Sequence, residues 1–210
     1  MKKNLLISVL MTIVTSVLLG LIYPLVVTGL AQLLMKDKAN GQLIVQNATT
    51  VGSRIIGQPF SGPRYFHSRP SAAGNGYDPT NSGASNLGPT NHALLDRVAA
   101  SVAAAAPDDP GVQVPIDLVT TSGSGLDPHI SPAAAAFQIA RVARARGMNE
   151  EDVRRVVAEH TEGRQLGFLG EPRVNVLELN LALDAMGHKA AQSPSPDGAN
   201  QPAAAPASNL

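Results

Sequence analysis

The feature that most constrains this chain is an apolar run near its N-terminus. After the opening MKKN, no charged residue occurs from Leu5 to Met35, and charge returns at Lys36-Asp37-Lys38. A bilayer core of about 30 Å needs roughly 20 helical residues, so this run is long enough to span a membrane. A cleavable signal peptide is the alternative, but its apolar region is roughly 7–15 residues long and ends in a small-residue cleavage site. The run is much longer and lacks a good site, which favours an uncleaved membrane anchor over residues 1–35.

The orientation of the anchor is suggested by the basic residues that flank it. Lys2 and Lys3 favour a cytoplasmic N-terminus, although Lys36 and Lys38 partly balance them. Pro24 lies inside the run and is expected to kink or end the helix locally, because it lacks a backbone donor. The sequence therefore predicts a single-pass membrane protein whose large domain lies outside the cytoplasm.

Composition limits the kinds of site that the rest of the chain can carry. Its 210 residues include 16 basic and 16 acidic side chains, so no positive excess points toward nucleic acid. The absence of cysteine excludes disulfides, thiolate chemistry and cysteine-ligated zinc. The histidines lack H-x-x-x-H or H-E-x-x-H spacing, and neither a P-loop nor the DKTGT sequence of phosphorylated pumps occurs. We therefore expect no catalytic site, no metal site and no ATP hydrolysis by this chain itself.

Residues 36–189 predict one small α/β domain of the α+β kind, followed by a disordered, low-complexity tail over residues 190–210. Short strands are expected at residues 41–46 and 53–60, and a buried strand at residues 114–122, where apolar residues alternate.

A long loop is expected over residues 61–91, because Gly, Pro, Ser and Asn crowd that segment. Disordered segments usually lack aromatic residues, whereas this one contains Tyr65, Phe66 and Tyr77. The sequence therefore predicts an ordered loop that packs on a surface.

Four helices are indicated by their start and stop signals. Asn91 caps an alanine-rich helix, Ser131 and Pro132 begin a second helix that ends at Gly147, and Asn149 caps a third. The first should carry Leu94, Leu95, Val98 and Val102 on one face, and the third should turn Val153, Val156, Val157 and His160 inward.

The segment at residues 174–187 is ambiguous between a strand and the fourth helix. Alternating leucines suggest a strand, yet Asn175 and Glu178 form a capping-box pattern and Gly187 is a stop signal, which favours a helix.

The stretch SGSGLDPHISP, Ser122 to Pro132, has the composition of an active site. Ser124, Asp127 and His129 could serve a membrane-anchored hydrolase, but the spacing does not match the G-x-S-x-G nucleophile elbow. The simpler interpretation is that glycines turn the chain and Ser131 begins a helix. We favour this architectural interpretation.

The arginines Arg141, Arg144 and Arg146 admit two interpretations as well. They could bind an anion, or they could lie on a solvated face that offsets the dipole at the helix C-terminus. We favour the solvated face.

Several long segments resemble one known family. YPLVVTGLAQ, IIGQPFSGPRYFHSRPSA, YDPTNSGASNLGPTN, PIDLVTTSGSGLDPHISPAAAAFQIARVARARG and VNVLELNLALD occur in the order seen in the C subunit of the Kdp-type high-affinity potassium-transporting ATPase of bacteria. The resemblance covers nearly everything from Tyr23 to Asp184. The chief departure is the Pro/Ala/Ser-rich tail.

The resemblance implies a single-span, non-catalytic accessory subunit in the bacterial cytoplasmic (inner) membrane. Its partners would be a channel-like potassium-binding subunit, a P-type ATP-hydrolysing subunit and a small assembly subunit. It implies no covalently bound cofactor, because the complex handles ATP and potassium. The family's nucleotide-linked glutamine corresponds here to Gln138.

Candidate partner-docking residues are Tyr65, Phe66, Arg69, Tyr77, Asn86 and Asp127. If the domain lies outside the cytoplasm, Gln138 cannot touch cytoplasmic ATP, and any effect on nucleotide affinity has to pass through the partner subunits. The alternatives from other classes are an independent membrane-anchored hydrolase and a membrane-tethered binding module.

Overall fold

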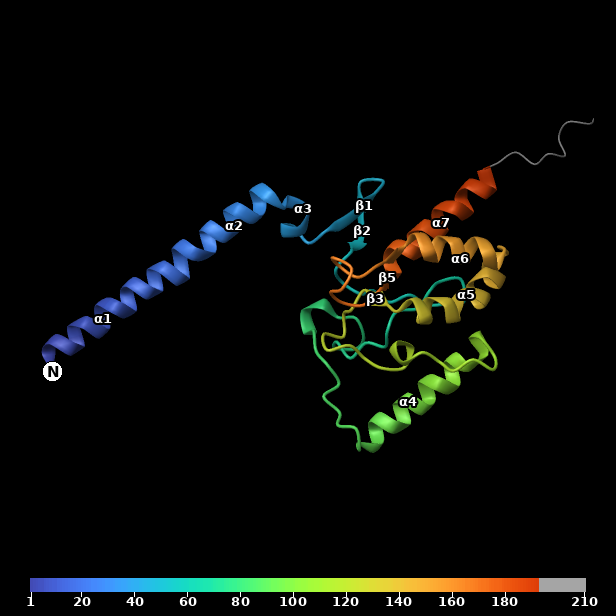
Figure 1. Ribbon diagram of the computed structural model, residues 1–210, viewed down its shortest axis with the longest axis horizontal. Coiled ribbons are helices and arrows are strands. Elements are labelled where there is room, and N and C mark those ends of the chain that lie inside the picture. Colours follow the sequence, from blue (N-terminus) through green and yellow to red (C-terminus); the bar gives the residue numbers. More distant parts are fainter. Residues whose placement is uncertain (193–210) are drawn as a thin grey trace, which may run out of the picture.

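A long helix carries the N-terminus away from a small mixed domain in the computed structural model, which describes residues 1–192 (Figure 1). The helix comprises α1 (Lys2–Val17), the π-helical turn η1 (Leu18–Ile22) and α2 (Tyr23–Leu34) without a break. Within the described part of the chain, the stretch Lys2–Leu34 is the one helix long and apolar enough to cross a membrane, and none of it is buried against the domain.

Pro24 changes the winding of this helix but does not end it. The turn before it is π-helical, with the N–H of Tyr23 donating to the carbonyl oxygen of Leu18. Proline lacks an N–H and its ring crowds the carbonyl four residues earlier, and a π-turn relieves that clash by widening the ladder. A helix end at Pro24, one of the two expected outcomes, is therefore wrong, because the helix continues through a π-turn.

A short helix and a hairpin connect the anchor to the domain. Helix α3 (Lys36–Ala39) is followed by the antiparallel strands β1 (Leu43–Gln46) and β2 (Thr49–Ser53). The strand expected at residues 41–46 is thus confirmed, but the one expected at 53–60 is wrong. The chain turns after Ser53, and the N–H of Gly57 donates to the carbonyl oxygen of Leu126, 2.8 Å away. The chain after Ser53 therefore bonds to another loop through the backbone of Gly57 and does not extend the strand.

The core of the domain lies between a small sheet and three helices. The sheet is antiparallel in the order β3 (His129–Ile130), β5 (Arg173–Asn175) and β4 (Thr161–Glu162). Helices α5 (Pro132–Arg146), α6 (Glu150–Glu159) and α7 (Val176–Gln192) pack together on it, and they supply most of the buried apolar residues (Figure 1). The predicted fold class, one apolar N-terminal helix and a small α/β domain, is confirmed.

The helix boundaries agree with their sequence signals. The Ser131 hydroxyl accepts from the N–H of Ala134 at the start of α5, and Gly147 ends α5 in the left-handed conformation with φ 65°. Asn149 caps α6, as expected.

The ambiguous segment is a helix, with the side chain of Asn175 accepting from the N–H of Glu178 at its start. The expected stop at Gly187 is wrong, because α7 continues to Gln192. The tail was expected to begin at residue 190; the part of it over 193–210 lies outside the described residues.

The buried strand expected at residues 114–122 is wrong. The segment instead contains the 3₁₀ turn η4 (Ile116–Leu118), and the Ile116 side chain is 74% exposed. Pro115 cannot donate to a strand ladder. The Asp117 carboxylate instead accepts from the N–H of Ser131 at 2.6 Å, so the segment holds the start of α5.

Helix α4 (His92–Ala105) stands apart from the core (Figure 1). Asn91 caps it through the N–H of Ala93, as predicted. None of its residues is buried, however, and Leu95 and Val102 are 52% and 38% exposed. The turns η2 (Pro79–Asn81) and η3 (Ala106–Asp108) precede and follow α4 in the chain.

Candidate functional site

The loop over residues 61–91 is held on the domain by two buried side-chain amides. The Oδ1 of Asn180 accepts from the N–H of Phe66 at 2.8 Å, and its Nδ2 donates to the Phe66 carbonyl at 2.9 Å. Gln138 does the same for the next residue: its Oε1 accepts from the N–H of His67 at 2.8 Å and its Nε2 donates to the His67 carbonyl at 3.2 Å. Both amides thus pair with the loop backbone as a neighbouring strand would. We call Asn180 and Gln138 the amide latch.

The amide of Gln138 has little capacity left for another ligand. Only 1% of the residue is exposed. Its Nε2 also donates to the carbonyl oxygen of Ala134, and its Oε1 accepts a second bond from Arg141 Nη2 at 2.6 Å. A nucleotide could reach this amide only if the loop left the domain.

Arg141 fastens the beginning of the same loop. Its Nη1 donates to the carbonyl oxygens of Pro63 and Tyr65 at 2.8 and 3.0 Å, and its Nε donates to the Asp108 carboxylate at 2.7 Å. The side chain is only 13% exposed.

Arg146 fastens the neighbouring turn of the loop. Its Nε donates to the Arg64 carbonyl at 2.6 Å, its Nη2 lies 2.9 Å from Asp184, and its guanidinium carbon lies 5.2 Å from the centre of the Tyr65 ring. The solvated-face interpretation is therefore wrong for Arg141 and Arg146, whose donors bind loop carbonyls, whereas Arg144 is exposed as expected.

The glycine-rich stretch 122–132 fastens the far half of the loop. The Ser71 hydroxyl donates to the carbonyl oxygen of Gly125 at 2.6 Å, and the N–H of Gly83 donates to that of Ser124 at 2.9 Å. Gly125 is buried with φ 68°, and a Cβ there would lie 2.7 Å from both the nitrogen of Ala73 and the Gly83 oxygen. This stretch needs glycine for close backbone approach, which supports the architectural interpretation.

The candidate hydrolase residues do not form a nucleophile and base pair. The exposed Ser124 hydroxyl accepts from the N–H of Leu126. Asp127 accepts from the backbone N–H of His129 at 3.0 Å, and its carboxylate lies 3.5 Å from the His129 ring and from Arg69. Burial alone would raise the pKa of Asp127, but the hydrogen bonds from His129 and the nearby positive charges lower it. The Asp127 carboxylate thus binds the backbone of His129 at the start of β3 and pairs with Arg69.

The candidate docking residues occupy different depths. Phe66 is completely buried in the core and offers no surface to a partner. Tyr65 and Tyr77 are half-buried, and the Tyr77 hydroxyl donates to the carbonyl oxygen of Arg69. Asn86 is exposed with φ 51°.

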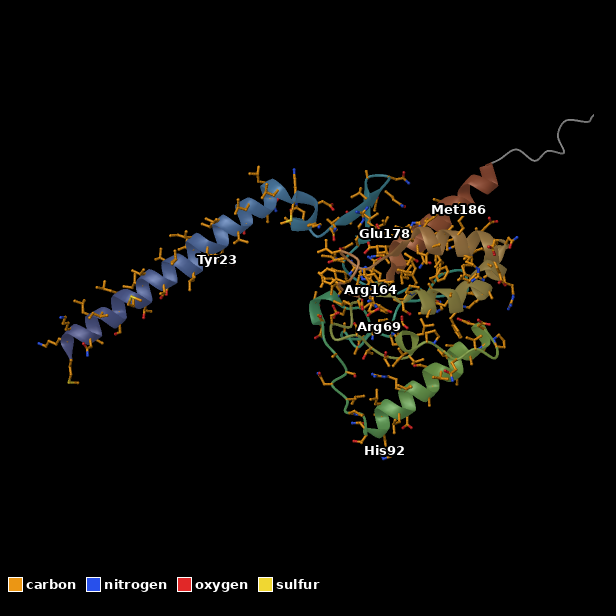
Figure 2. All side chains as sticks on the ribbon, viewed as in Figure 1. Tyr23, Arg69, His92, Arg164, Glu178 and Met186 are labelled. Atoms are coloured by element: carbon orange, nitrogen blue, oxygen red, sulfur yellow. The ribbon has the colours of Figure 1, made fainter. Side chains whose placement is uncertain are left out.

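Arg69 and Asp127 line one cavity of about 490 Å³. Arg69 also donates to the carbonyl oxygens of Thr120 and Thr121, so it holds two loops together inside the domain (Figure 2).

A second cavity, of about 360 Å³, lies between α4 and the amide latch. It is lined by His67, Ser68, Pro70, Ser101, Ala104, Ala105, Asp108, Leu118 and Gln138. The described residues contain no group of three or more His, Asp or Glu side chains able to hold a metal ion. Sequence reasoning missed Asn180 and the loop contacts of Arg141, although an asparagine within the apolar repeat LELNLAL is itself a signal of a buried polar role.

Comparison with known proteins gives long matches. A family model described as "K+-transporting ATPase, c chain" matches residues 5–185. A potassium-transporting ATPase KdpC subunit of Koribacter versatilis is 69% identical over 184 residues, covering 88% of this chain and 95% of the relative. The subunit of the same name from Acidobacterium capsulatum is 58% identical, covering 85% and 96%, and that from Rhodospirillum rubrum is 60% identical, covering 80% and 89%.

Proposed function

This chain belongs to the family of K+-transporting ATPase c chains, and from that premise we propose that it is a non-catalytic accessory subunit of an ATP-driven potassium import complex. In this role it supports assembly and raises the ATP affinity of the ATP-hydrolysing subunit. Its partners are that P-type subunit, a channel-like potassium-binding subunit and a small assembly subunit. ATP and potassium are handled by the complex, and this chain carries no covalently bound cofactor.

We also propose that the domain lies outside the cytoplasm, with the N-terminus inside. Lys2 and Lys3 support this orientation. The loop over residues 61–91 then faces the side from which potassium enters, and it is the surface that docks on the channel-like subunit.

The observation that carries the proposal is the amide latch. Gln138, the residue that the family resemblance links to nucleotide, is buried and bonded to the His67 backbone. An effect of Gln138 on ATP affinity therefore fits a positioning role: Gln138 fixes the loop, and the loop biases the conformational states of the partner subunits. Such an effect is a coupling free energy between two sites, which needs no contact with ATP.

Two substitutions test this function in the purified complex. Gln138→Leu and Asn180→Leu each remove one arm of the latch, whereas Gln113→Leu changes an exposed glutamine as a control. Both latch variants should raise the ATP concentration at half-maximal potassium-dependent hydrolysis by about five- to tenfold, as expected for a coupling of about 1–1.5 kcal/mol. The control should change it little.

Two outcomes would contradict parts of this proposal. Normal ATP dependence in a complex that lacks this chain would refute the accessory role. A defect in Gln138→Leu without one in Asn180→Leu would favour direct contact between Gln138 and nucleotide. Only complexes that co-purify with all their subunits should be compared, because each substitution leaves buried backbone groups unpaired.

A further inference from the structure

A polar cavity of about 460 Å³ lies where the membrane helix meets the domain. Figure 2 shows Glu178, one of its lining residues, on the side of the domain near β1 and β2. The cavity is lined by Lys38, Gln42, Arg54, Ile55, His129, Glu162, Arg173, Asn175 and Glu178. The loop that the proposed function uses contributes none of these residues, so the cavity is a separate feature.

The charges around the cavity leave a positive excess. Arg54 pairs with Glu178 at 2.7 Å, and Arg173 pairs with Glu162 at 2.9 Å. Lys38 is exposed and makes no ion pair or side-chain hydrogen bond with any described residue. Its ammonium group is therefore available to an anion.

The two arginines keep donors that their ion pairs do not use. Arg54 contacts Glu178 through Nε, and Arg173 contacts Glu162 through Nε and Nη2. A guanidinium carries five N–H donors, so both retain donors for the oxygens of a phosphate. Their side chains are 50% and 44% exposed, which leaves them accessible from solvent.

The connection to the anchor fixes the cavity close to the membrane surface. The membrane helix ends at Leu34, and Lys38 follows within the next turn. The side chains of Gln32 and Asn40 are hydrogen-bonded at 3.1 Å, so α3 is held against the end of the helix.

Backbone bonds continue from α3 into the cavity wall. The N–H of Gln42 donates to the carbonyl oxygen of Asp37 at 3.0 Å, and the N–H of Arg54 donates to that of Gln42 at 3.1 Å. Headgroups occupy roughly the 5–8 Å beyond each side of the hydrocarbon core, which is the region just past the end of the span.

Apolar side chains beside the cavity favour a lipid over a free ion. Ile55 lines the cavity and is 52% exposed, and Leu43 and Val45 on the adjoining hairpin are 55% and 59% exposed. A free phosphate ion makes no favourable contact with apolar side chains, whereas a phospholipid has acyl chains next to its phosphate that can pack against them.

We infer that this cavity binds the phosphate group of an anionic phospholipid headgroup. Lys38 and the free donors of Arg54 and Arg173 bind its oxygens, and Ile55 and Leu43 contact the adjoining acyl region. Glu162 and Glu178 hold the arginines in place through their ion pairs.

Native mass spectrometry of the full chain in detergent micelles tests the inference. The micelles contain equal amounts of phosphatidylglycerol and phosphatidylcholine, and the readout is the number of each lipid retained per chain. Lys38→Gln removes the unpaired cation, and Lys36→Gln is the matched control, since Lys36 lies on the same short helix but does not line the cavity. Both lysines are exposed, so neither substitution disturbs the core.

We expect the wild-type chain to retain phosphatidylglycerol in preference to phosphatidylcholine. Lys38→Gln should lower this preference about fivefold, and Lys36→Gln should change it by less than about twofold. Equal retention of the two lipids by the wild-type chain would overturn the inference. Equal losses in both variants would also overturn it, because they would show a diffuse surface attraction. Loss of phosphatidylglycerol on addition of inorganic phosphate, with phosphate itself retained, would assign the cavity to the free ion instead.

Discussion

Burial governs the protonation of His67, a residue of the long loop whose backbone is bound by Gln138 of the amide latch. Burial lowers its pKa below the ordinary value of 6.5, and the positive charge of Arg141 lowers it further, against opposing effects of the Gly62 hydrogen bond and of Asp108. The unfolded chain therefore binds a proton at a higher pH than the folded chain does. The contribution of His67 to stability is full above pH 6.5 and is lost as the pH falls below that value.

Replacing His67 should remove part of this pH dependence. We expect the free energy of unfolding of the full chain, measured with urea at about pH 7.5 and about pH 5.5, to fall less in His67→Gln than in the wild-type chain. His92→Gln changes an exposed histidine at the start of α4 and is the control (Figure 2). An identical fall in His67→Gln and the wild-type chain would contradict the assignment.

At the residue scale, local signals were predictable and distant partners were not. Ser131, Asn149 and Asn175 act on residues two or three positions away, so their capping roles can be read from a few letters of sequence. The latch joins His67 to Gln138 across 71 positions and Phe66 to Asn180 across 114. The residues next to an asparagine or a glutamine in the sequence do not indicate which distant backbone groups its amide will bind.

Gly125 decides whether the long loop can lie against the glycine-rich stretch. An alanine there has to adopt φ 68° and bring its Cβ to 2.7 Å from two backbone atoms, whereas Gly123 has no atom within 4 Å of the same position. Gly125→Ala should therefore destabilise the chain by about 1–3 kcal/mol and expose the loop to proteases, and Gly123→Ala should not. Urea unfolding and limited proteolysis of both variants check this. Matching stability of the two variants would argue against close docking.

Helix α4 should be the least protected helix of the domain. None of its residues is buried, whereas much of α5 lies in the core. A helix of about this length is marginal without tertiary contacts. Hydrogen exchange of the isolated full chain should therefore proceed faster over residues 92–105 than over 132–146. Comparable protection of the two segments would show that α4 is held by contacts that the structure lacks.

At the element scale, apolar alternation was an unreliable guide to strands. Val114, Ile116 and Leu118 alternate, yet Pro115 interrupts any ladder and Ile116 faces solvent. Helices were better predicted, because α4, α5 and α6 begin at the caps Asn91, Ser131 and Asn149 that the sequence indicates. The domain covers the face expected on α4 only in part: Leu94 and Val98 are half-buried, whereas Leu95 and Val102 are exposed.

At the scale of the whole molecule, the N-terminal helix is joined to the domain by a hydrogen-bonded connection. Hydrogen bonds between Gln32 and Arg54 join the end of the long helix to the four-residue helix α3 and to the hairpin. The membrane span is therefore not followed by a flexible linker. These hydrogen bonds limit the motion of the hairpin relative to the end of the helix. In the proposed complex, this connection would present the loop over residues 61–91 to the channel-like subunit in one orientation.

The side of the membrane on which this domain lies decides between the two ways in which Gln138 can influence ATP. The chain contains no cysteine, so Gln113→Cys, at an exposed position outside the loop over residues 61–91, introduces a single thiol. A membrane-impermeant maleimide applied to intact cells, with any outer membrane permeabilised, should label it, because Lys2 and Lys3 favour a cytoplasmic N-terminus. Labelling only after lysis would place the domain in the cytoplasm and make direct contact with nucleotide sterically accessible once the loop opens. Labelling of intact cells would show that the bilayer separates Gln138 from cytoplasmic ATP. Gln138 could then change ATP affinity only through a conformational coupling carried by the partner subunits.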